Sequence, residues 1–74
     1  MVHEVVAEMP GTVWSVDSTV GDRVEADQVL LWLESMKMEI PVLPATCGVI
    51  AAVCVGVGDV VHEGDVLLRL HRDS

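Results

Sequence analysis

The sequence predicts an all-β domain, a flattened barrel or sandwich whose two halves are related by a pseudo-twofold axis. Three observations lead to this prediction. Hydrophobic residues make up 51% of the 74 positions, yet Phe and Tyr are absent and the apolar bulk comes from Val and Leu. Because Val is β-branched, this composition favours strands. No segment has the spacing of an amphipathic helix. The third observation is an internal repeat.

Residues 11–33 align with residues 48–70 at a constant offset of 37 positions, and 10 of the 23 aligned positions are identical. The pattern V-G-D-x-V followed by V-L-L-x-L therefore occurs twice. Segments this short cannot each bury an apolar face alone, so we expect the two halves to pack against each other. We predict a single domain over residues 1–74, in which a hairpin at residues 34–39 joins the two quasi-repeats.

The apolar stretches between turn residues place the strands in order along the chain. Gly21-Asp22 and Gly58-Asp59 are expected to be turns, because Gly permits positive φ and Asp can accept hydrogen bonds from nearby backbone. Two short strands next to these turns bring the total to eight. The expected ranges are 3–7, 12–17, 23–24, 28–35, 38–43, 49–54, 60–61 and 65–71.

Differences between the repeats indicate which side of each strand faces outward. Trp32 and Glu34 align with Arg and His of the second repeat, so this side of the strand is expected to face solvent. Val13 and Val16 are both apolar but three positions apart, which breaks the two-residue alternation of a strand and predicts a β-bulge. The inward-facing set is expected to be Val29, Leu31 and Leu33 with their counterparts Val66, Leu68 and Leu70.

The net charge excludes several classes of partner. Twelve acidic residues against four basic ones give a formal charge of −8. Such a domain repels phosphate backbones and anionic lipid headgroups, so we expect no nucleic-acid or membrane binding. The uncharged stretch 40–58 is long enough to suggest a membrane span, but it contains two Pro and three Gly and half of it belongs to the repeat.

Enzymatic activity is not expected from this chain. A domain of this size buries a marginal core and has little room for a deep active site. The three His residues have no metal-binding spacing, and no nucleophile–base set or phosphate loop is present. Cys47 and Cys54 are seven positions apart and do not form a motif, which favours free thiols and a cytoplasmic location. We expect so acidic a domain to be a monomer.

Lys37 is the only lysine of the chain and lies between the two repeats. With Met36 and Lys37 as a two-residue turn, the inward-facing residues of the flanking strands come opposite one another. The same register places Glu34 opposite Glu39, a destabilising like-charge pair. The turn also lacks the Asn-Gly that a tight hairpin prefers. Two local rules are broken at one position, which is typical of functional sites.

The segment 34–39, E-S-M-K-M-E, resembles the biotin-attachment motif of biotinyl domains, in which a lysine lies between two methionines. Residues 7–13 (A-E-M-P-G-T-V) are similar to the family's opening A-P-M-P-G-x-V, and residues 20–24 and 57–61 to its two V-G-D/Q-x-V turns. The resemblance covers nearly the whole chain. It implies the biotinyl/lipoyl-like barrel-sandwich hybrid, a flattened barrel of two four-stranded antiparallel sheets with the lysine at a hairpin tip.

This resemblance implies that Lys37 carries biotin in amide linkage, attached by a biotin protein ligase. Met36 and Met38 are then the flanking motif residues, and Glu34 and Glu39 face the ligase or increase solubility. The domain would be a non-catalytic biotin carboxyl carrier, serving a biotin carboxylase and a carboxyltransferase.

Two alternatives remain open. A lipoyl carrier has the same fold, although that family usually has Asp-Lys-Ala at the positions of Met36, Lys37 and Met38; lipoate, or both groups, would then be attached. An unmodified interaction module is the second alternative.

Because the chain starts directly on the domain, without a Pro/Ala-rich linker, and has no room for an extra loop in its first half, we expect a small free-standing carrier. Which carboxylase it serves, if any, is open.

Overall fold

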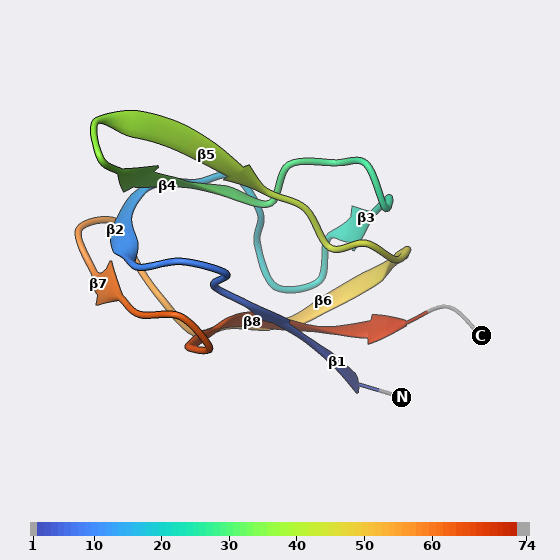
Figure 1. Ribbon diagram of the computed structural model, residues 1–74. Coiled ribbons are helices and arrows are strands. Elements are labelled where there is room, and N and C mark those ends of the chain that lie inside the picture. The colour runs from blue at the N-terminus through green and yellow to red at the C-terminus, as the bar shows by residue number, and fades with distance from the viewer. Residues whose placement is uncertain (1, 73–74) are drawn as a thin grey trace.

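The computed structural model describes residues 2–72, which form eight strands in two four-stranded antiparallel sheets (Figure 1). The strand orders are β1-β8-β6-β3 and β5-β4-β2-β7. The predicted fold class is confirmed. Residues 2–72 contain no helix, and therefore none that could span a membrane. The strands are β1 (Val2–Val6), β2 (Gly11–Val16), β3 (Arg23–Val24), β4 (Leu31–Ser35), β5 (Met38–Val42), β6 (Gly48–Val53), β7 (Val60–Val61) and β8 (Val66–Arg72).

The two halves of the chain exchange strands between the sheets. At the repeat offset, β1 to β4 correspond to β5 to β8, and each sheet combines two strands of the first half with two of the second. The turn hydrogen bonds follow the same symmetry. Val13 N donates to Asp59 O and Ile50 N donates to Asp22 O, each at 2.8 Å. Each half therefore completes the backbone pairing of the other.

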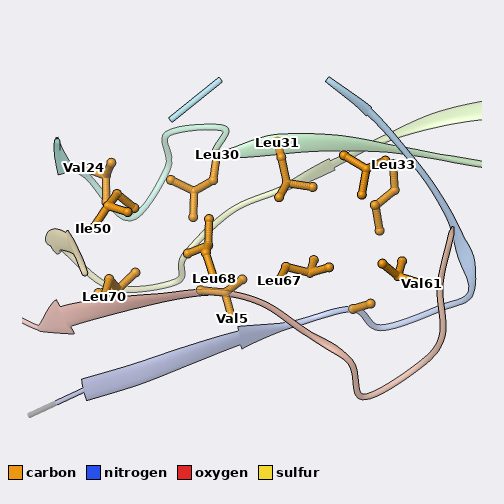
Figure 2. Packing of buried hydrophobic residues seen from close by; sticks show 12 residues of the cluster. Val5, Val24, Leu30, Leu31, Leu33, Ile50, Val61, Leu67, Leu68 and Leu70 are labelled. Atoms are coloured by element: carbon orange, nitrogen blue, oxygen red, sulfur yellow. The ribbon is translucent and has the colours of Figure 1, made fainter. Parts of the chain in front are cut away.

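Leucine layers from the two halves form the centre of the core. Figure 2 shows Leu30, Leu31 and Leu33 extending toward Leu67 and Leu68 of the opposite layer. All five side chains are at most 2% exposed. Fully burying a leucine stabilises a fold by about 1.5–3 kcal/mol, and neither half could do so alone. The remaining core residues are Val5, Ala7, Val13, Val24, Ile50, Val61 and Leu70.

The predicted inward-facing set was wrong at one position in each half. Val29 and Val66 are only partly buried, whereas the following residues, Leu30 and Leu67, are completely buried. The physical reason is that strict alternation begins later than expected. Regular β4 starts at Leu31, so Leu30 precedes it. In β8, the pairing with β1 skips Leu67, which lets two consecutive leucines reach the core.

The predicted bulge and turns are confirmed. The β2–β4 register shifts between Val13 and Ser15, which accommodates the three-residue apolar spacing. Both predicted turn glycines have a φ of 95°. The aspartates that follow them, Asp22 and Asp59, each accept a hydrogen bond from the backbone N–H three residues earlier, at 2.9 and 2.8 Å. These carboxylates close turns and are far from the lysine in sequence.

The fold separates the lysine hairpin from the ends of the described chain. The molecule measures 36 × 18 × 17 Å. In Figure 1 the β4–β5 hairpin turns at the left end of the molecule, whereas β1 begins and β8 ends at the right. The hairpin tip therefore extends beyond the leucine core.

Two equivalent glycines allow the strands to approach closely. A Cβ on Gly11 would lie 2.8 Å from the carbonyl oxygen of Glu34, and a Cβ on Gly48 would overlap that of His71. Glu34 and His71 are themselves equivalent residues of the two halves. Both positions therefore require glycine for the same steric reason, because the two halves repeat the same strand pairing.

Gly48→Ala should lower the free energy of unfolding by about 3 kcal/mol, because the added methyl group forces the backbone of β6 away from β8. The matched control is Gly56→Ala, where a Cβ meets no atom within 4 Å. This variant should be neutral or up to about 1 kcal/mol more stable. Urea denaturation of both variants checks the prediction. Equal stability of the two would contradict the steric role of Gly48.

Candidate functional site

The β4–β5 hairpin has the predicted register. Leu33 pairs with Ile40, and Ser35 pairs with Met38, which leaves residues 36 and 37 as a two-residue turn. Leu33 is buried, so the base of the hairpin is anchored in the core. The chain therefore passes from the buried interior at Leu33 to the exposed tip at Lys37 within four residues.

The turn at the tip has an unfavourable backbone conformation. Met36 has a φ of 53° and Lys37 a φ of 64°, the positive values that a type I′ hairpin turn requires at both central residues. Gly and Asn adopt such values readily, whereas other residues are strained by about 1–3 kcal/mol each. Local stability would select other residues at this turn. Met36 and Lys37 are thus not the residues that local stability favours, which is typical of a functional position.

The lysine and its two neighbours are displayed to solvent. Met36 is 92% exposed and Met38 is 65% exposed, and Lys37 is also exposed. None of the hydrogen bonds and ion pairs within residues 2–72 holds the Lys37 ammonium. A free primary amine on a rigid tip can enter the active site of another protein without any unfolding of this domain.

The two glutamates predicted near the site lie directly below the turn. Glu34 of β4 and Glu39 of β5 are paired across the hairpin, and both are exposed. Strand alternation places them on the outer face of the sheet, opposite the buried Leu33. The structure thus brings all five predicted site residues to one tip. The five are Glu34, Met36, Lys37, Met38 and Glu39.

The lysine does not lie in a cavity. A groove of about 460 Å³ opens between β1 and β5, but its lining includes none of the turn residues. It is lined mainly by apolar residues, together with His3, Glu4 and Glu8. This geometry suits presentation of Lys37 to another protein's active site.

One polar cluster close to the hairpin is not apparent from the sequence. The Trp32 indole Nε1 donates to Asp17 Oδ2 at 3.1 Å, and the hydroxyl of Ser15 donates to Asp17 Oδ1 at 2.8 Å. The outward position of Trp32 was predicted, but its partner belongs to a different strand connection. Only the β2–β4 pairing brings these residues together.

The free thiols of Cys47 and Cys54 contact the Glu25 carboxylate and the Arg69 guanidinium, respectively.

Comparison with known proteins assigns the chain to a class. Residues 1–70 match the Biotin_lipoyl family, which is described as "Biotin-requiring enzyme". The chain belongs to this family of attachment domains. Such domains are non-catalytic carriers, so the chain is a carrier and not an enzyme in its own right.

Small relatives match along nearly their whole length. The chain is 45% identical over 67 residues to the biotinylated protein TB7.3 homolog of Mycobacterium leprae, covering 90% of this chain and 94% of the relative. It is 46% identical over 70 residues to a biotin/lipoyl attachment protein of Bacillus subtilis, covering 95% and 96%. Among solved structures, a single-chain, multi-domain long-chain acyl-CoA carboxylase superimposes with a TM-score of 0.91 and 32% identity, over 99% of this chain and 7% of that chain.

Relief of the strain at the turn should stabilise the domain. Met36→Asn/Lys37→Gly places the residues preferred by a type I′ turn at the tip and should raise the free energy of unfolding by about 1–2 kcal/mol. Lys37→Ala is the control, since it removes the amine but keeps a Cβ at positive φ, and it should change stability by less than about 0.5 kcal/mol. Urea unfolding curves measure both. A turn that is unstrained would show no gain in the double variant.

Proposed function

We propose that this chain is a biotin carboxyl carrier, biotinylated on Lys37 by a biotin protein ligase. The observation that carries the proposal is the display of the only lysine of the sequence, unpaired and exposed, on a turn between two exposed methionines. The backbone strain at this turn supports a functional reason for its residues. Membership of the Biotin_lipoyl family supports the choice of group.

The residues at the tip fit covalent attachment. The deprotonated Lys37 Nζ attacks the acyl carbon of biotinyl-adenylate, so that an amide bond forms, AMP leaves and the proton of the amine passes to the ligase or to water. Met36 and Met38 offer flexible, polarizable side chains that adapt to an enzyme surface. The buried base of the hairpin holds the turn in place, so little conformational entropy is lost when an enzyme closes over it.

Once attached, biotin would supply a ring that carries a carboxyl group between two active sites, those of a biotin carboxylase and a carboxyltransferase. Tethering to Lys37 replaces free diffusion by a high effective concentration at each site. The chain contributes a small, rigid support with one exposed attachment point. We also propose that it works as a monomer in the cytoplasm, where ATP for the ligase reaction is available.

Lipoate on Lys37 is the competing attachment, because the fold is shared and one relative is named for both groups. The presence of Met36 and Met38 around the lysine, where lipoyl domains usually have Asp and Ala, favours biotin. An unmodified module would need neither the exposed amine nor the strained turn.

Intact-mass measurement tests the attachment. The chain incubated with biotin, ATP and a biotin protein ligase should gain the mass of one biotinyl group, and Lys37→Arg should gain none. The matched control is Lys37→Arg/Arg69→Lys, which also has a single exposed lysine, on β8 of the other sheet. This variant should stay unmodified, because its lysine does not lie on the hairpin tip.

The same measurement separates the alternatives. The protein can also be isolated from cells that contain both a biotin protein ligase and a lipoate ligase. An added lipoyl mass would then favour lipoate, and no added mass would contradict both attachments. Biotinylation of the control variant Lys37→Arg/Arg69→Lys would show that any exposed lysine suffices, contrary to the proposal.

A further inference from the structure

Both tryptophans of the chain lie on the outer face of the sheet that carries Lys37. Trp32 sits between two buried leucines of β4 and therefore faces outward, and Pro41 of β5 is paired with it. Trp14 is the extra residue at the bulge of β2, next to the residue paired with Trp32, and is 50% exposed. The chain has no Phe or Tyr, so all of its aromatic surface is concentrated here.

The ring of Trp32 is held in a fixed orientation. Its indole nitrogen donates to Asp17, whose other carboxylate oxygen accepts from the Ser15 hydroxyl. A side chain that is already ordered loses less entropy on binding than a free one. Trp32 is partly exposed, and tryptophan is among the residues most enriched at the positions that dominate protein–protein binding energies.

The charges around this aromatic surface all have the same sign. Apart from Lys37 in the turn, the charged side chains at the outer face of this sheet within residues 2–72 are Asp17, directly after β2, and the paired Glu34 and Glu39. The two glutamates lie between Trp32 and the lysine turn. A complementary protein surface must therefore present an apolar centre with a rim of Arg or Lys.

The opposite sheet shows that the fold does not require these side chains. Arg69 occupies the position equivalent to Trp32, and Ala51 the position equivalent to Trp14. Arg69 is neutralised there by an ion pair with Glu4, whose carboxylate lies 3.0 Å from the guanidinium Nε. The same backbone thus supports a charge-paired face on one side and an aromatic, acidic face on the side of the lysine.

We propose that this tryptophan face is the docking surface for the biotin protein ligase. The inference rests on the function proposed above. The ligase is favoured over a carboxylase because it transfers the biotinyl group directly to Lys37 Nζ. Its active site must therefore come within the length of one lysine side chain of the hairpin. A carboxylase acts on the attached biotin, which holds its active site farther from the surface of the domain. The tryptophan face consists of Trp14, Trp32 and Pro41, with a rim of Asp17, Glu34 and Glu39.

Steady-state kinetics of biotinylation test this docking surface. Trp14→Ala/Trp32→Arg installs the residues found at the equivalent positions of the opposite sheet, and a biotin protein ligase that modifies the wild-type chain is used as the probe. We expect KM for the carrier to rise about 30-fold, the loss expected for one dominant tryptophan, with kcat within about twofold because Lys37 is unchanged. The control Arg69→Ala, on the opposite face, should keep the wild-type KM.

The outcomes distinguish the two proposals. A wild-type chain that gains no biotin contradicts the proposed function, and the docking surface falls with it. A wild-type chain that is modified while the double variant keeps the same KM overturns the docking surface alone, and so does an equal rise in KM for Arg69→Ala. Trp14→Ala by itself serves if the double variant does not fold, since this half-exposed side chain contributes little to the core; an unchanged KM in this variant also counts against the proposal.

Discussion

The mutual burial of two leucine layers is the constraint on which the rest of this structure depends. Neither half of the chain has a second apolar layer of its own, so the half that contains Leu31 needs the half that contains Leu68. The exchange of strands between the sheets adds backbone pairing to this apolar contact. A chain of 74 residues has little stability beyond this. The close approach at Gly11 recurs at Gly48 because the two halves repeat the same strand pairing.

That core permits an unfavourable turn at the hairpin tip. The pairing of β4 with β5 is held by buried residues, so positive φ values at Met36 and Lys37 persist although their side chains gain no burial. The strain is local and small compared with the burial energy of several leucines. The result is an exposed amine at one end of an elongated domain, away from the end where β1 begins and β8 ends.

The duplicated frame leaves the outer surfaces free to differ. Inward-facing residues repeat in chemistry because both halves fill the same core, and equivalent turns repeat because both must bond the other half. Outward-facing positions have no such requirement. Trp32 and Arg69 occupy equivalent places with opposite character, one beside the lysine and one on the far sheet. The differences between the halves therefore indicate function more directly than their similarities.

Periodic features of the chain were predictable because they arise between neighbouring residues. The three-residue spacing of Val13 and Val16 indicated a bulge, and the Gly-Asp pairs indicated turns. The correspondence of β1 with β5 was not apparent from the sequence, because few residues of these two strands are identical at the repeat offset. It becomes visible only in the structure, where β1 pairs with β8 as β5 pairs with β4. The burial of Leu30 and Leu67 was missed because the onset of regular pairing, and not apolar character, decides which of two adjacent residues faces inward.

The sequence by itself determined the all-β class, the pseudo-twofold repeat, the register of the β4–β5 hairpin and the singular position of Lys37, because alternation, turn chemistry and residue identity are local properties. The tertiary structure alone decided how the strands are exchanged between the sheets, and that Trp32 bonds to Asp17. It also decided that both tryptophans share a face with the lysine hairpin. These features depend on which distant strands become neighbours, and that choice is made by long-range burial and hydrogen bonding across the whole domain.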